Sequence, residues 1–120
     1  MLFVVAHHDR EKLETLTQQL LLAFRGSVVY QHTDASRILS DVLFYDVDAV
    51  YLETQATGVI LSSLLRALHR KRPELPVFLL SEAGSCSEAD CEDYSALLSD
   101  SVEVDGLIEA MQAAQPPQLS

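Results

Sequence analysis

Short apolar runs alternate along the chain with longer stretches in which apolar residues recur every three or four positions. The runs have the length of β-strands, and the recurring positions are typical of amphipathic helices. A helix is predicted after each run, although residues 82–94 are polar and acidic and leave room for only a short or irregular fourth helix. The apolar runs predict strands at residues 2–6, 27–31, 48–53, 76–81 and around 95–99. The pattern therefore repeats one strand–helix unit along the whole chain.

Polar residues and a glycine mark where the first two helices begin and end. We expect Asp9 to cap the amino end of the first helix and Gly26 to follow its carboxyl end. Thr33 or Asp34 is expected to cap the second helix. The apolar faces of the four clear helices comprise Leu13, Leu16, Leu20 and Phe24; Ile38, Leu39, Val42 and Leu43; Leu61, Leu64, Leu65 and Leu68; and Val104, Leu107, Ile108 and Met111.

Strands this apolar, each followed by an amphipathic helix, indicate a parallel sheet that is covered by helices on both faces. Repetition of the unit predicts a flavodoxin-like (βα)5 sandwich of three layers with the strand order 2-1-3-4-5. A length of 120 residues and a hydrophobic content of 48% suit a single domain. We place that domain at residues 1–112 and interpret residues 113–120, which include Pro116 and Pro117, as a tail or a linker to a further domain.

The charge balance narrows the range of partners. Lys and Arg number 8 against 18 Asp and Glu, so we expect this domain to bind neither nucleic acid nor an anionic membrane surface. No apolar run reaches the roughly 20 residues of a membrane span, and the absence of a signal peptide predicts a cytoplasmic protein. Cys86 and Cys91 are predicted to be free thiols. Neither a glycine-rich phosphate loop nor a nucleophile elbow is present, so we expect no enzyme and no cofactor.

The segment from Asp48 to Ser81 carries a more specific pattern. A buried strand ends in Glu53, a helix follows, and the turn Arg72-Pro73-Glu74-Leu75-Pro76 leads into the next strand. This segment resembles the centre of a chemotaxis-type response-regulator receiver domain, a family of bacterial two-component signal transduction. A weaker likeness covers most of the chain. In the family, the position of Glu53 holds the aspartate that accepts a phosphoryl group, so the resemblance implies a signalling or transcription-regulatory module.

The resemblance also places substitutions at the functional positions of the family. The acidic pair that holds Mg²⁺ in receivers is matched by His7 and His8, and Asp9 is the only nearby carboxylate. The acceptor position holds Glu53, whose extra methylene moves the carboxylate by about 1 Å, a misplacement that can cost on the order of 10²-fold in rate. Both changes work against transfer of a phosphoryl group to this chain.

Two further functional positions lie where the fourth and fifth strands end. The switch hydroxyl of the family is matched by Ser81, but the lysine that pairs with the phosphoryl group is matched by Asp100, which has the opposite charge. Without the acidic pair there is no hard oxygen cage for Mg²⁺, and without the lysine there is no clamp for the transferred charge. The resemblance therefore implies a phosphorylation-independent pseudo-receiver, in which Glu53 is a fixed negative charge or imitates a phosphorylated aspartate.

Partner binding is the function that a pseudo-receiver retains. In the family, partner contacts and dimers form largely on the face built from the fourth helix, the fifth strand and the fifth helix. The matching segment begins at Glu82, ends at Met111 and is rich in Asp and Glu. The resemblance implies a protein partner or a homodimer through this acidic face, which suits a basic or amphipathic surface.

Other functions stay open on the sequence alone. The chain also resembles the flavodoxin-like N-terminal wing of pyridoxal-phosphate-dependent ornithine, lysine or arginine decarboxylases, which serves assembly and has no catalytic residues. Alternatively, His7, His8, Asp9 and Glu53 form a small metal site, because imidazole and carboxylate suit Zn²⁺. The same residues allow a protonated histidine to neutralise Glu53, so that the charge of the site changes near about pH 6 to 7.

Overall fold

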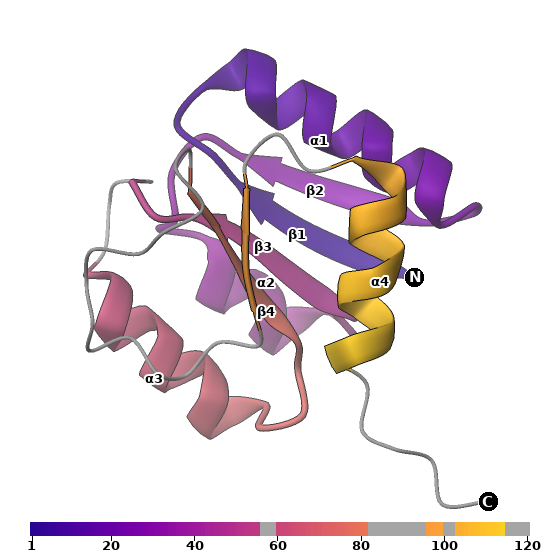
Figure 1. The fold of residues 1–120 in the computed structure, drawn as a ribbon. Coiled ribbons are helices and arrows are strands. Elements are labelled where there is room, and N and C mark those ends of the chain that lie inside the picture. Colours follow the sequence, from indigo (N-terminus) through magenta and orange to yellow (C-terminus); the bar gives the residue numbers. More distant parts are fainter. Residues whose placement is uncertain (56–59, 82–95, 100–102, 115–120) are drawn as a thin grey trace, which may run out of the picture.

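The computed structural model describes residues 1–55, 60–81, 96–99 and 103–114. The strands form one parallel sheet in the order β2-β1-β3-β4-β5 (Figure 1), which confirms the flavodoxin-like class and the strand order expected from the sequence. Within the described ranges, no helix is long and apolar enough to cross a membrane. The elements are β1 (Leu2–Ala6), α1 (Arg10–Ala23), β2 (Val28–His32), α2 (Ile38–Phe44), β3 (Ala49–Glu53), α3 (Leu61–Lys71), β4 (Val77–Ser81), β5 (Ala96–Ser99) and α4 (Val104–Ala114).

Two apolar layers cover the sheet, one on each face, because successive residues of a strand point to opposite faces. Helices α1 and α4 lie over one face, and α2 and α3 lie over the other (Figure 1). On β1, Phe3 and Val5 belong to the core under α1 and α4, whereas Val4 and Ala6 belong to the core under α2 and α3. Every residue of the central strand β3 is buried, which explains its unbroken apolar run and places its terminal carboxylate inside the protein.

The two ends of α1 agree with the signals in the sequence. Asp9 caps the helix, because its Oδ1 accepts hydrogen bonds from the backbone amides of Glu11 and Lys12 at 3.0 and 3.4 Å. Gly26 follows the helix with a φ of +79°, in the left-handed region that glycine adopts without steric cost. The cap and the terminating glycine predicted for this helix are both confirmed.

The start of α2 differs from the prediction. The helix begins at Ile38, and neither Thr33 nor Asp34 caps it. Asp34 Oδ1 accepts hydrogen bonds from the Ser36 hydroxyl and amide at 2.5 and 2.9 Å, which lower the pKa of Asp34 and fix the turn ahead of the helix. Leu43 was expected on the apolar face but is 55% exposed, because the late start leaves a short helix with a narrow buried side.

Helix α4 continues to Ala114, two residues beyond the domain boundary placed at residue 112. Residues 115–120 lie outside the described part of the chain, so the linker interpretation stays a prediction. The expected short fourth helix within residues 82–94, together with Cys86 and Cys91, also lies outside it.

All strands run in one direction, so their carboxyl ends meet at one edge of the sheet. β1 lies between β2 and β3, and the helices that follow β1 and β3 cover opposite faces. Open α/β sheets bind ligands at such a switch point. The register pairs Ala6 of β1 with Leu52 of β3, so the residues that come next, His7 and Glu53, are neighbours at this edge.

Candidate functional site

Glu53 ends β3 with a carboxylate that is fully engaged by protein donors. The residue is 4% exposed. Its Oε1 lies 2.7 Å from Nδ1 of His8 and 3.4 Å from the His8 backbone amide, while Oε2 accepts a hydrogen bond from the Gln55 amide at 2.9 Å. Each oxygen therefore has a donor supplied by a loop that follows β1 or β3.

His8 lies directly against Glu53 at this edge of the sheet. The hydrogen bond with Glu53 raises the pKa of His8 above its ordinary value of 6.5, and it outweighs the opposing effect of burial. The His8 side chain is 52% exposed and the Glu53 side chain 5%, so the pair joins a solvent-facing imidazole to an interior carboxylate. This is the contact through which a protonated histidine would neutralise Glu53, an interpretation that the sequence left open beside a metal site.

His7 lies beside His8 but is buried. It is 1% exposed, its backbone amide donates to the His32 carbonyl at 3.1 Å, and its Nδ1 accepts the Asp9 amide hydrogen at 3.0 Å. Because Nδ1 acts as an acceptor, the ring is a neutral imidazole with its proton on Nε2. The rings of His7 and His8 stack with centroids 5.3 Å apart, which helps to hold His8 over Glu53.

The four residues considered for a metal site separate into a cluster and a helix cap. His7, His8 and Glu53 each offer one ligand atom, and these atoms lie within 4.8 Å of one another. Asp9 is not in that group, because its carboxylate caps α1. Two imidazoles and one carboxylate suit Zn²⁺ better than Mg²⁺, which requires oxygen ligands. In the structure, however, the Nδ1 atoms of both histidines already take part in hydrogen bonds.

The remaining candidate residues lie on the next strands. Ser81 ends β4 and is 8% exposed, one residue beyond Leu80, which pairs with Glu53. The Thr54 amide donates to the Leu80 carbonyl at 2.9 Å, so a backbone hydrogen bond joins β4 to the residue that follows Glu53. Asp100 lies outside the described residues, and its alignment with the lysine of the receiver family stays a prediction.

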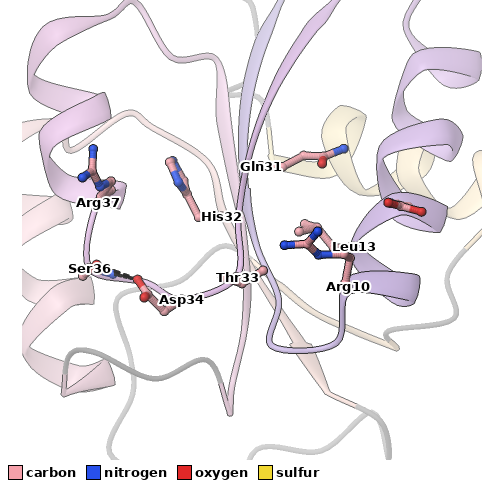
Figure 2. A pocket seen from close by; sticks show the side chains of 9 residues that line it. Arg10, Leu13, Gln31, His32, Thr33, Asp34, Ser36 and Arg37 are labelled. Atoms are coloured by element: carbon pink, nitrogen blue, oxygen red, sulfur yellow. Dashed lines mark hydrogen bonds between the residues drawn. The ribbon is translucent and has the colours of Figure 1, made fainter.

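A second histidine–carboxylate pair was missed from the sequence. His32 Nε2, at the end of β2, lies 2.5 Å from Asp41 Oδ2 of α2. His32 also borders a groove of about 390 Å³, which is lined by residues at the end of β2 and not by Glu53 (Figure 2). Arg10 from α1 and Arg37 ahead of α2 stand on opposite sides of the strand in that view. The position of His32 could have indicated this pair, since His32 immediately follows the strand predicted at residues 27–31, at the same edge of the sheet as Glu53.

Comparison with solved structures places this geometry in a known fold. No family model matches the chain, and no curated protein matches it. A response-regulator receiver domain from Clostridium thermocellum superimposes with a TM-score of 0.75 at 18% identity, covering 94% of this chain and 92% of that one. A CheY-like receiver domain protein from Methanospirillum hungatei gives 0.77 at 16% identity, covering 92% and 90%. A putative pilus assembly-related protein from Burkholderia pseudomallei gives 0.75 at 22% identity, covering 100% and 94%. At these identities the likeness establishes a receiver fold.

Proposed function

We propose that this chain is a receiver-like signalling or regulatory module that works without aspartyl phosphorylation. The observation that carries the proposal is the engaged carboxylate of Glu53, buried at the acceptor position with His8 on one oxygen and the Gln55 amide on the other. A carboxylate that attacks a phosphoryl donor needs an oxygen open to in-line approach. Here each oxygen already accepts a hydrogen bond from the protein, which competes with its approach to a phosphoryl donor.

The charge around Glu53 supports the same conclusion. Receivers balance the phosphoryl charge with a metal ion held by acidic residues, whereas the neighbouring side chains here are imidazoles. Mg²⁺ binds oxygen ligands in octahedral geometry, and the donor group contains only one carboxylate. His8 instead lies against the carboxylate, and its protonated form balances the charge of Glu53 within the protein. In this proposal the partner of Glu53 is therefore His8 and not a bound Mg²⁺.

Contact with a partner is the function left to such a domain, and we place it on the acidic face between Glu82 and Met111. The described part of that segment comprises β5, Glu103 and α4 as far as Met111. Glu103, Asp105 and Glu109 are exposed there, while Met111 is buried against the sheet. An exposed row of carboxylates over a rigid helix suits a basic protein surface.

The direct test is chemical. Incubation with acetyl phosphate and Mg²⁺, followed by intact-mass measurement, is expected to give no increase of about 80 Da, the mass of one phosphoryl group. A receiver domain with an intact acidic pair, treated in parallel, serves as the positive control. The Glu53→Gln variant locates any adduct, because it removes the carboxylate at the acceptor position. A labile adduct that appears on the natural chain and is absent from this variant would overturn the proposal.

A further inference from the structure

The outer edge of β2 offers unused backbone hydrogen-bonding groups. The Val28 amide donates to Met1, and the His32 carbonyl accepts from His7, so alternate residues 28, 30 and 32 direct their backbone groups toward β1. Val29 and Gln31 must then direct their N–H and C=O groups away from the sheet. β2 is an end strand, and among the described residues only β1 pairs with it. Such an edge is a template for another strand.

The helices on either side of this edge leave apolar side chains exposed. On α1, Thr17 receives a hydrogen bond from the Gln31 side chain, so Leu21, one turn later, lies on the flank toward β2. On α2, Asp41 binds His32, so Phe44 and Tyr45 lie on the corresponding flank. Phe44 is 81% exposed, Tyr45 48% and Leu21 38%.

The strand itself lacks the usual protection of an edge. Natural edge strands are shielded by lysine, proline or a bulge. The sequence of β2 is Val-Val-Tyr-Gln-His, without lysine or proline, and Val28 at its start is 51% exposed. Grooves run along its outer side, bordered by Gln31 and His32 together with residues of α1 and α2. The edge is therefore open to an incoming strand along its whole length.

We propose that β2 pairs with β2 of a second copy in antiparallel orientation about a two-fold axis at Tyr30. In this register Val29 faces Gln31 of the second copy, and the outward groups of these residues form four N–H···O hydrogen bonds around the axis. The two Tyr30 residues form the central pair without mutual backbone hydrogen bonds. The outward-pointing residues are placed symmetrically about Tyr30, so the contact closes on itself as an isologous dimer.

In the same arrangement, the α2 helices of the two copies place oppositely charged residues near one another. A two-fold axis perpendicular to the sheet keeps the two α2 helices on one face and runs them in opposite directions. The end of α2 that carries Arg37 then meets the end that carries Phe44 and Asp46 on the second copy. All of these residues are exposed, so a cation meets an aromatic ring and a carboxylate.

Sedimentation equilibrium on the whole chain tests the dimer, in about 0.15 M salt so that the repulsion from a net charge of −10 is screened. We expect a reversible monomer–dimer equilibrium that Phe44→Glu weakens at least about tenfold, since it replaces an exposed aromatic ring of the α2 flank with a charge. Leu22→Glu is the matched control. Leu22 is 67% exposed on α1, but it lies away from the β2 flank and should leave the equilibrium unchanged. A natural chain that stays monomeric at about 1 mM overturns the proposal, as does equal loss in both variants.

Cysteine cross-linking tests the register. In a background in which Cys86 and Cys91 are replaced by serine, Tyr30→Cys is expected to form a disulfide across the axis, because facing Cα atoms in such a pair lie about 4.5 Å apart. Val28→Cys is the control, since the proposed register holds the two copies of residue 28 about 14 Å apart, beyond disulfide reach. Circular dichroism establishes that both variants fold. A Val28→Cys variant that cross-links as readily as Tyr30→Cys contradicts the register.

Discussion

The contact between His8 and Glu53 should make stability depend on pH in a way that a double-mutant cycle can isolate. His8→Phe keeps an aromatic ring beside His7 but removes Nδ1, and Glu53→Gln keeps the shape of the side chain but removes its charge. Ion pairs at protein surfaces contribute about 0.2–1 kcal/mol, and hydrogen bonds to charged groups about 1.5–3 kcal/mol. With the His8 side chain 52% exposed and Glu53 buried, we expect a coupling energy of about 1 kcal/mol at pH 6.

The sign of the pH dependence follows from the direction of the shift. The pKa of His8 is raised by its bond to Glu53, so the folded protein holds this proton more tightly than the unfolded chain does. The contribution of the pair is therefore complete below about 6.5, the ordinary pKa of histidine, and is lost as the pH rises through the raised pKa of the folded state.

Urea unfolding of the natural chain, the two single variants and the double variant gives the coupling energy at each pH. We expect it to fall from about 1 kcal/mol at pH 6 to less than about 0.3 kcal/mol at pH 9. A coupling energy that is constant over this range, or that grows with pH, would refute the charged pair described here.

Two further predictions concern groups that the sequence did not single out or left open. Tyr51 is fully buried, no described residue hydrogen-bonds to its hydroxyl, and burial raises its pKa. Tyr51→Phe should therefore raise the free energy of unfolding, measured by urea titration, by up to about 1 kcal/mol. A decrease in the free energy of unfolding by more than about 1 kcal/mol would show that the hydroxyl has a partner. Titration with Zn²⁺ in a calorimeter should show no binding at micromolar concentration, because the metal ion would have to displace the contact between His8 and Glu53. Tight binding of Zn²⁺ that His8→Phe abolishes would contradict this prediction.

The positions of the strands were predictable because the apolar runs reflect burial on both faces of a parallel sheet. Residues 2–6 were predicted for β1 and are observed as Leu2–Ala6, and Glu53 does end a buried strand. The second strand was placed one residue early, at 27–31 rather than Val28–His32. Its edge position explains the error, since an end strand is only partly buried and its boundaries carry a weaker apolar signal.

The roles of the residues at the site were less predictable than their positions. His7, His8 and Asp9 are consecutive, and the sequence could not tell which of them faces Glu53. The direction is set by the backbone beyond β1, where the His7 amide bonds to His32 and the Asp9 amide bonds to His7 Nδ1. These bonds turn His7 inward and leave His8 over the carboxylate. Asp9 was named both as a helix cap and as a candidate ligand, and the cap is the role that the structure gives it.

The separation of core from site explains how a receiver fold can persist when the residues at the edge of the sheet differ. The two buried clusters consist of apolar residues, and neither includes His7, His8 or Glu53. Packing requires apolar volume at the right period, which many sequences satisfy, whereas phosphoryl transfer requires particular atoms at fixed distances. Matches with TM-scores of 0.75 to 0.77 at 16 to 22% identity therefore report on the clusters and not on the edge of the sheet. The proposed function therefore depends on the contact between Glu53 and His8, and the packing of the two cores does not determine this contact.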